Sequence, residues 1–397
     1  MNESQSHDVP LQNDIGKERL ANLLGVYETL ANWGLHPKIL VIGSYRRYGL
    51  KGDKDTEFLP AELKEGEQRP IWNFVSEGNE GKRSFVKAVV DPKDESVATY
   101  HDHRTEALFY QLVRNKVVDE NRVKEINVDM PVLERVNEDK SVIAISLVDG
   151  ADVANQHYEV KANLKPETAN TIHKFILSFH DKSLAQWRQE IPEFENYFPL
   201  DATGDSLLDK ELNNHRLRFE SRKAKINGLV GNEYIGKMEK MLEEGSIFFK
   251  LDPSQAEEDQ LTLLNPNMNA GNFMEGNDGK IYAVDWQSFK ISHPVTASAY
   301  FIETLWNNPE LYDRTLTDTL EKFKGDRNAI EMLRYELAFL RLSGVAVRFY
   351  RPVAEDSLRS QEDRDHAKNA MEVLGNRLKE AIDKTGVWAK FYSQDSP

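Results

Sequence analysis

Two polar side chains in the C-terminal half of the sequence have the chemistry of magnesium ligands. Asn272 lies in the segment Gly271-Asn272-Phe273-Met274, and Asp285 ends an apolar run. The turn residues Asn277-Asp278-Gly279 separate them, so a hairpin would bring the two side chains together. Amide and carboxylate oxygens are hard ligands that suit a Mg²⁺ ion holding phosphates. An ordinary hairpin with a polar loop and an acidic strand end explains the same residues equally well.

The N-terminal half carries a second group of polar residues. Lys87 lies in the strand-like run SFVKAVV, after a hairpin signal with Gly78 and Gly81 at its turn, and Glu106 begins the helical pattern EALFYQLV. A carboxylate can hold a flexible lysine ammonium in one place through an ion pair. Taken singly, Lys87 is more simply an exposed strand lysine and Glu106 a solvated helix residue.

The elements that would position these residues change in kind along the chain. Before residue 150, strand patterns dominate, with one amphipathic helix expected over residues 101–116. The expected strands are KILVIGSY, IWNFVSEG, KRSFVKAVV, MPVLERV and SVIAISLV. Beyond residue 150 the pattern is helical, interrupted by one island of short strands at LTLL, NFM and KIYAVDW. The sequence therefore predicts an α+β protein with a β-rich lobe at 1–150 and a helical lobe at 151–397.

Composition limits the classes of function. The chain has 397 residues, a formal net charge of -15 and no cysteine. The length favours two domains, and the acidity argues against nucleic acid and membrane surfaces as partners. The acidity is compatible with a cationic substrate, but it is equally ordinary for a cytoplasmic protein. The polar N-terminus is unlike a signal peptide, and no apolar run reaches the ~18 residues of a membrane span, so we expect a soluble, cytoplasmic protein.

The segment LLNPNMNAGNFMEGNDGKIYAVDWQSF, residues 263–289, resembles the catalytic and metal-binding loops of the aminoglycoside phosphotransferase and choline kinase superfamily. Those enzymes carry H-G-D-x-H-x-x-N, followed by a hairpin and an apolar strand that ends in D-W or D-F. Asn272 matches their metal-binding Asn, and Asp285 matches their metal-binding Asp. Lys87 resembles their phosphate-binding Lys, and Glu106 resembles the helix Glu that pairs with it. Four such residues in this order and in these element types are a much rarer coincidence than any one alone.

The resemblance covers residues 72–306 and implies a protein-kinase-like bilobal fold, with ATP or GTP and Mg²⁺ in the cleft between the lobes. It implies phosphoryl transfer to a small-molecule acceptor. Gly78 and Gly81 would then cover the phosphates. The run from Ile145 to Gly150 resembles the hinge between the lobes, where the backbone of Leu147 and Val148 would bond the adenine.

One loop departs from the family pattern. Asn267 stands where the family has its catalytic Asp, and Asn265 and Asn269 replace the two His residues. An amide does not act as a general base near neutral pH. Three explanations remain: a working kinase in which another group takes the proton or the acceptor is already ionised and is oriented by Asn267; a nucleotide-binding pseudokinase that acts through a protein partner; and another transfer, such as nucleotidylation. Phosphotransfer ranks first because the Lys, Glu, Asn and Asp set is complete.

Three further patterns carry weaker interpretations. Gly43-Ser44 with Asp53-Lys54-Asp55 faintly resembles a two-metal nucleotidyltransferase site, although a solvated charge run is the simpler explanation. His101-Asp102-His103 is either part of a metal site or a polar approach to the following helix. His173 and His180 lie seven residues apart on one expected helix, and we assign them no chemistry.

Overall fold

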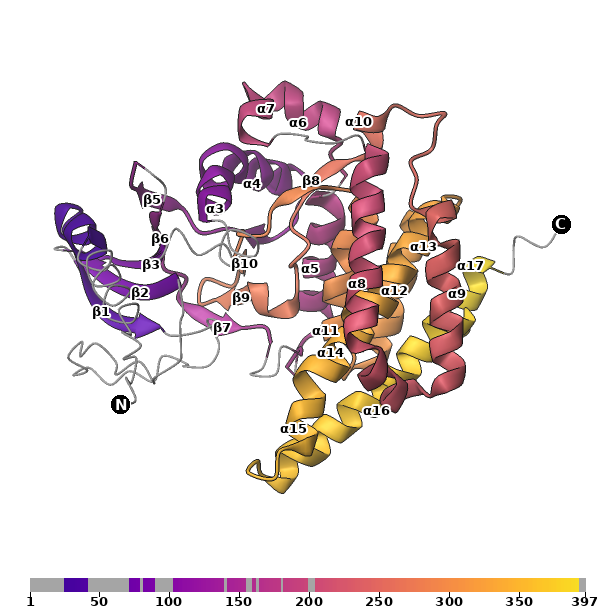
Figure 1. Cartoon of the computed structure of the whole chain (residues 1–397). Coiled ribbons are helices and arrows are strands. Elements are labelled where there is room, and N and C mark those ends of the chain that lie inside the picture. The colour runs from indigo at the N-terminus through magenta and orange to yellow at the C-terminus, as the bar shows by residue number, and fades with distance from the viewer. Residues whose placement is uncertain are drawn as a thin grey trace, which may run out of the picture. The chain divides into compact units, whose positions relative to one another are not determined.

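The chain forms two compact units in the computed structural model (Figure 1). The described residues are 25–41, 71–78, 81–89, 103–138, 141–154, 159–161, 164–179, 181–198 and 204–392. The N-terminal tail, the Gly43–Asp55 motif, His101, Asp102 and His180 lie outside them. The smaller unit takes its residues from Met1–Arg114, Met130–Asp149 and Asp285–Ser288, and the larger unit contains the rest. A division of the chain at residue 150 stays a prediction, and the units differ from it at 115–129 and 285–288.

The smaller unit is built on a five-stranded antiparallel sheet in the order β1-β2-β3-β6-β5. Its strands are β1 (Leu35–Val41), β2 (Ile71–Gly78), β3 (Arg83–Val89), β6 (Val142–Ser146) and β5 (Leu133–Val136). β2, β3, β5 and β6 lie within runs that the sequence predicts as strands, whereas β1 begins three residues before the predicted run KILVIGSY. β3 is the central strand, and Lys87 in it pairs with Asn73 of β2 and Ile143 of β6.

A helix over residues 25–32 covers one face of this sheet. Val26 and Leu30 of this helix pack in one buried cluster with Val86 and Ala88 of β3. Successive side chains of a strand point to opposite faces. Lys87, between these two apolar residues, therefore points to the face opposite the helix.

One continuous helical segment follows the sheet's first three strands. It consists of α3 (His103–Leu108), the π-helical turn η1 (Phe109–Val113) and α4 (Arg114–Val123). The predicted helix over 101–116 therefore extends further, and its last turns belong to the larger unit.

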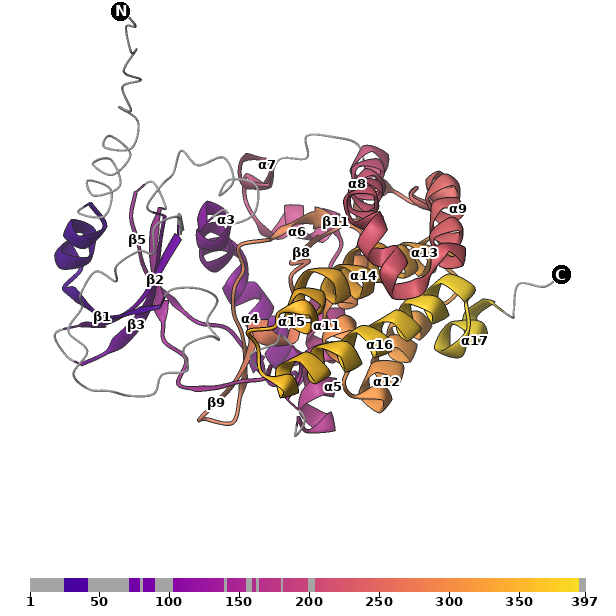
Figure 2. The same cartoon turned by 60° about the horizontal axis from the view of Figure 1, so that its bottom comes forward.

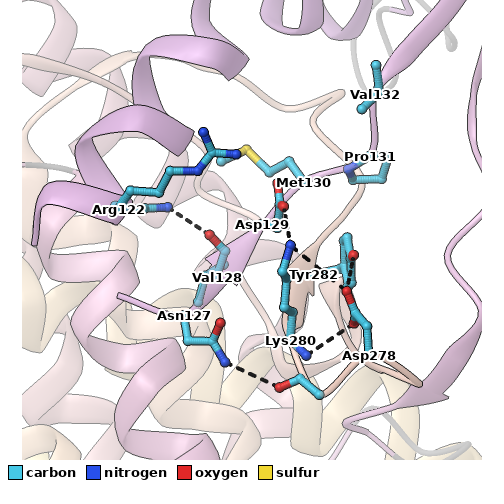
Figure 3. Close-up of polar contacts among 12 residues, drawn as sticks. Arg122, Asn127, Val128, Asp129, Met130, Pro131, Val132, Asp278, Lys280 and Tyr282 are labelled. Atoms are coloured by element: carbon cyan, nitrogen blue, oxygen red, sulfur yellow. Dashed lines mark hydrogen bonds and ion pairs between the residues drawn. The ribbon is translucent and has the colours of Figure 1, made fainter. Parts of the chain in front are cut away.

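The larger unit begins with a small sheet that joins α4 to the β island. The order is β4-β10-β9-β7, and β4 (Val128–Asp129) runs parallel to β10 (Ile281–Ala283). Polar contacts surround this pairing (Figure 3): Asn127 donates to the carbonyl of Gly279 at 3.2 Å, and the Lys280 ammonium lies 3.3 Å from Asp129. These contacts fix the β9–β10 hairpin, β9 being Phe273–Gly276, against the end of α4.

Helices make up the rest of the larger unit (Figure 2). They are α5 (Pro166–Phe179), α6 (Leu184–Glu190), α7 (Phe194–Tyr197), α8 (Gly204–Val230), α9 (Asn232–Phe248), α10 (Glu257–Gln260), α11 (Ala297–Thr304), α12 (Pro309–Lys322), α13 (Arg327–Tyr335), α14 (Ser343–Val345), α15 (Arg351–Glu355), α16 (Gln361–Asp383) and α17 (Ala389–Tyr392). Two π-helical stretches, η4 (Glu336–Leu342) and η5 (Ala346–Tyr350), lie between α13 and α15. Two short strands, β8 (Thr262–Leu264) and β11 (Lys290–Ser292), pair antiparallel. The α+β class is confirmed, and no helix among the described residues is both long and apolar enough to cross a bilayer.

Gly150 begins β7 (Gly150–Asp152), which pairs with β9, and the two backbones approach very closely there. A Cβ atom on Gly150 would lie 2.2 Å from the carbonyl oxygen of Glu275. We expect Gly150→Ala to lower the free energy of unfolding by about 1–3 kcal/mol, the range for overpacking. Gly236→Ala, in α9 with nothing within 4 Å of its Cβ position, is the matched control and should be neutral or stabilising. Urea unfolding of both variants checks this, and equal stabilities would contradict it.

Candidate functional site

A buried lysine and a buried glutamate form the centre of the candidate site. The Lys87 ammonium lies 2.9 Å from Oε1 and 2.7 Å from Oε2 of Glu106, and both side chains are 0% exposed. The Asp285 carboxylate lies 3.0 Å from the same ammonium and is 19% exposed. All three residues belong to the smaller unit. The structure therefore brings together three of the predicted site residues around one cation.

Attraction between the Lys87 ammonium and the two carboxyl groups opposes the effect of burial on their pKa values. Burial alone would lower the pKa of Lys87, but the Asp285 and Glu106 carboxylates outweigh it and hold this pKa above its usual range. Burial, reinforced by Asp285, raises the pKa of Glu106, while the Lys87 ammonium opposes the rise. The lysine therefore stays charged at neutral pH. One ammonium beside two carboxyl groups leaves Asp285, the exposed member, able to bind a further cation.

The backbone at Asp285 is held in a rarely occupied conformation. Its φ angle is +66°, in the left-handed region that non-glycine residues seldom adopt. The next residue, Trp286, is fully buried and stacks on Phe109, with ring centroids 3.8 Å apart and planes 5° apart. The Trp286 N–H also donates to Glu106 at 3.3 Å. The π-helical turn η1, which begins at Phe109, thus helps to hold Asp285 beside Lys87, and such strain is typical of functional sites.

The asparagine loop lies in the larger unit, between β8 and β9. Asn265 is fully buried, and its Oδ1 accepts the N–H of Asn267 at 3.0 Å. Asn269 caps the 3₁₀ turn η2 (Ala270–Asn272) by accepting the Gly271 N–H at 2.8 Å. Asn272 Nδ2 donates to the Asn267 carbonyl at 2.6 Å. The amides thus fold the loop by hydrogen bonds that need no ionised side chain.

Two predicted magnesium ligands differ in their surroundings. Asn272 is buried in the larger unit, and its carbonyl accepts the N–H of Val284 at 2.8 Å. Val284 directly precedes Asp285, which belongs to the smaller unit. No cluster of three or more His, Cys, Asp or Glu side chains suited to a metal occurs within the described part of the chain. Mg²⁺ needs only one or two protein oxygens when phosphates and water supply the rest, so the partly exposed carboxylate of Asp285 suits it.

The remaining predicted site residues lie in the smaller unit. Gly78 ends β2, and Gly81 follows in the turn with a φ of +75° and donates its N–H to Gly78 at 2.9 Å. Leu147 and Val148 are partly exposed and lie between β6 and the start of the larger unit. The structure does not test their predicted contacts with a nucleotide.

Sequence reasoning missed three charged residues around the asparagine loop. Arg341 donates to the carbonyl of Pro266, the residue before Asn267, at 3.3 Å, and Glu336 lies 2.6 Å from Arg341. Glu303 is buried in α11, and its neighbour Thr304 accepts the N–H of Ala270 at 3.3 Å. In an α-helix, residues five apart are about 140° apart around the axis, so the pattern ELAFLRL gave no sign that Glu336 and Arg341 meet.

Comparisons with known proteins gave matches at the level of structure. No family model matches the sequence, and no curated protein matches it either. Among solved structures, 111 chains match.

Three of these chains illustrate the kinds of protein that match. A macrolide 2′-phosphotransferase from Brachybacterium faecium is 10% identical, with 87% of this chain and 97% of that chain covered and a TM-score of 0.43. A spectinomycin phosphotransferase is 16% identical, with 84% and 92% covered and a TM-score of 0.40. A choline/ethanolamine kinase family protein from Mesorhizobium loti is 12% identical, with 78% and 88% covered and a TM-score of 0.40.

Proposed function

We propose that the chain is a phosphotransferase that moves the γ-phosphoryl group of ATP or GTP to a small-molecule acceptor. The observation that carries this proposal is the buried Lys87–Glu106 pair, with Asp285 held beside it in a left-handed conformation. A buried ion pair is poor evidence for stability, since replacing it with apolar residues is often neutral or stabilising. Its presence beside a partly exposed carboxylate is better explained by phosphate and metal binding.

Each site residue has its own role in nucleotide or metal binding in this proposal. Lys87 would hold the α- and β-phosphates, and Glu106 would keep the ammonium in place. Gly78 and Gly81 would cover the phosphates, and the backbone of Leu147 and Val148 would bond the base. Asn272 and Asp285 would supply oxygen ligands to Mg²⁺, which, when bound, neutralises charge on the transferring phosphoryl group.

A second function is favoured by the asparagine loop. Asn267 has no carboxylate with which to take a proton, and the neighbouring positions Asn265 and Asn269 are amides that hold the loop together. A nucleotide-binding pseudokinase that acts through a protein partner would need Lys87 and Asp285 but no base. The two functions differ in turnover, since only the enzyme transfers phosphate.

Calorimetry with MgATP and MgGTP tests the nucleotide site. We expect the wild type to bind one of them, and Asp285→Ala to weaken that binding about tenfold or more by loss of a metal ligand, a change of about 1.4 kcal/mol or more. With EDTA in place of Mg²⁺, the same variant should bind the nucleotide no worse than the wild type, since the ligand removed belongs to the metal.

Asp318→Ala is the matched control, because Asp318 is an exposed carboxylate on α12 paired only loosely with Arg314 at 3.9 Å. It should bind MgATP as the wild type does. A wild type that binds neither nucleotide would refute both functions, and an Asp285→Ala variant with unchanged MgATP affinity would refute the metal assignment.

A further inference from the structure

The hydrogen bonds of the asparagine loop determine which way the amide of Asn267 points. Asn269 Oδ1 accepts the Gly271 N–H at 2.8 Å, so its Nδ2 must be the group that faces Asn267. That Nδ2 lies 3.1 Å from the backbone carbonyl and 3.3 Å from the side-chain Oδ1 of Asn267. The oxygen of Asn267 is therefore already occupied, and its Nδ2 points elsewhere. No residue in the described part of the chain accepts a hydrogen bond from this Nδ2.

A second donor contacts the residue before Asn267. The Arg341 guanidinium donates through Nη2 to the carbonyl of Pro266 and through Nε to Glu336 at 2.8 Å, and it lies 4.2 Å from the centre of the Tyr300 ring. Its side chain is 17% exposed, and its Nη1 donates to none of the residues that the structure describes. Around Asn267, the loop thus offers N–H donors from an amide and from a guanidinium whose charge is paired with Glu336.

The π-helix η4 explains how Arg341 comes to lie there. Hydrogen bonds in a π-helix join residues five apart, so Glu336 and Arg341 lie on nearly the same side of η4. The Glu336 carboxylate, 8% exposed, can then hold the guanidinium through both Nε and Nη2. An α-helix of the same sequence would turn Arg341 away from Glu336. The π-helical turn therefore positions this cation against the asparagine loop.

The carboxyl groups near the loop are not available as bases. The Glu336 carboxylate forms an ion pair with the Arg341 guanidinium. Glu303 is 2% exposed and its Oε2 has no hydrogen-bond partner among the described residues. Burial raises the pKa of Glu303 to about 8, so it carries a proton at neutral pH. Neither of these two carboxyl groups therefore repels a carboxylate or a phosphate near Asn267, and neither is free to deprotonate an alcohol.

We propose that the acceptor is an oxyanion, a carboxylate or a phosphate, which receives hydrogen bonds from Asn267 Nδ2 and Arg341 and attacks the γ-phosphorus directly. This proposal rests on the phosphotransferase function and names its substrate class. An acceptor oxygen forms the new O–P bond with its own electron pair. The bond from the γ-phosphorus to the bridging oxygen breaks, and that electron pair leaves with the nucleoside diphosphate. No proton moves, so no base is needed, and the product is an acyl phosphate or a phosphoanhydride.

The test uses the full-length protein, γ-³²P-labelled ATP, Mg²⁺ and the low-molecular-weight filtrate of a cell extract as the source of acceptors. Labelled products are sorted by stability: neutral hydroxylamine cleaves an acyl phosphate but not a phosphoanhydride, mild acid cleaves both, and a phosphate ester of an alcohol survives both treatments. We expect label in one of the first two classes, and the class found distinguishes a carboxylate acceptor from a phosphate. Label in a stable ester would overturn the acceptor class but not the phosphotransferase. Binding of MgATP without any transfer would refute both.

Asn267→Asp gives a second readout on the same reaction. A carboxylate there repels an anionic acceptor, so transfer should fall at least tenfold, while hydrolysis of MgATP by water should rise about a hundredfold because water gains a base. Asn277→Asp adds the same charge at the exposed β9–β10 turn and should change neither rate. Faster transfer in Asn267→Asp would mean that the acceptor is an alcohol, and the proposal would fall.

Two substitutions of Arg341 separate the effect of its positive charge from that of its planar guanidinium group. Arg341→Gln should lower kcat/KM for the acceptor at least tenfold, while the affinity for MgATP stays the same. Arg341→Lys should recover part of the loss because it keeps the positive charge. Arg348→Gln, at an exposed arginine of η5, is the matched control. Equal losses in the Gln and Lys variants, or a loss in MgATP affinity alone, would assign Arg341 a purely structural role.

Discussion

Lys87→Ala is expected to lower the free energy of unfolding of the smaller unit by about 3–5 kcal/mol, the range for breaking a buried ion pair from one side. The variant leaves the fully buried Glu106 and the nearby Asp285 without the ammonium that both contact. It should also bind MgATP too weakly to measure, because the phosphates lose their cation. Thermal unfolding and calorimetry check the two effects separately.

A double variant separates stability from binding. Lys87→Met with Glu106→Leu replaces both charges with apolar side chains of similar volume, so most of the lost stability should return while MgATP binding stays absent. Arg83→Ala is the control for a general charge effect, since its 2.6 Å pair with Asp149 is 47% and 57% exposed and should contribute less than about 1 kcal/mol. Nucleotide binding by the double variant would show that Lys87 does not contact the phosphates.

The strands of the smaller unit could be predicted because their signals are local. Runs of apolar residues and a turn with Gly78 and Gly81 predict the β2–β3 hairpin, and the observed β2 matches the run IWNFVSEG. The burial of Lys87 could not be derived in this way. It depends on Glu106 of α3 and on Asp285, which lies 198 residues further along the chain than Lys87. Only the order of the motif residues pointed to this meeting.

The larger unit shows the limit of helical periodicity. The sequence predicts a helical pattern beyond residue 150, and α5 there buries one apolar face with Ile172, Phe175, Ile176 and Phe179. The π-helical stretches η4 and η5 do not follow the 3.6-residue period, so the pattern search could not align Glu336 with Arg341. The sequence identified the asparagines of the loop but not the direction of their amides, because that direction follows from hydrogen bonds made after the loop has folded.

Acid should unfold the larger unit well above the pH at which ordinary carboxylates protonate. Three of its histidines are buried: His173 is 2%, His215 is 1% and His293 is 5% exposed. Burial lowers the pKa of His173 and of His215 to about 3 and the pKa of His293 to about 4. The unfolded chain binds these protons near pH 6.5, so their stabilising effect is present above that pH and is lost as the pH falls towards 4.

Glu303 affects the pH dependence of stability in the opposite direction to the three histidines. Its pKa of about 8 means that the folded unit holds a proton that the unfolded chain releases above about pH 4.5. Near pH 5 the unfolded state therefore binds three histidine protons more and one glutamate proton fewer, a net difference of about two. Each proton corresponds to about 1.4 kcal/mol per pH unit. The free energy of unfolding should therefore fall by about 3 kcal/mol for each unit by which the pH is lowered near pH 5.

Urea unfolding at several pH values between 7 and 4 measures the slope, and His173→Gln should reduce it by about one proton's share, 1.4 kcal/mol per pH unit. Thr319→Val is the matched control, because Thr319 bonds His173 Nε2 at 2.9 Å and its loss removes the contact but keeps the buried imidazole. Since burial is the main cause of the lowered pKa, Thr319→Val should reduce stability and leave the slope unchanged. A slope that changes as much in Thr319→Val as in His173→Gln would show that packing at this site, rather than protonation of the histidine, sets the response to acid.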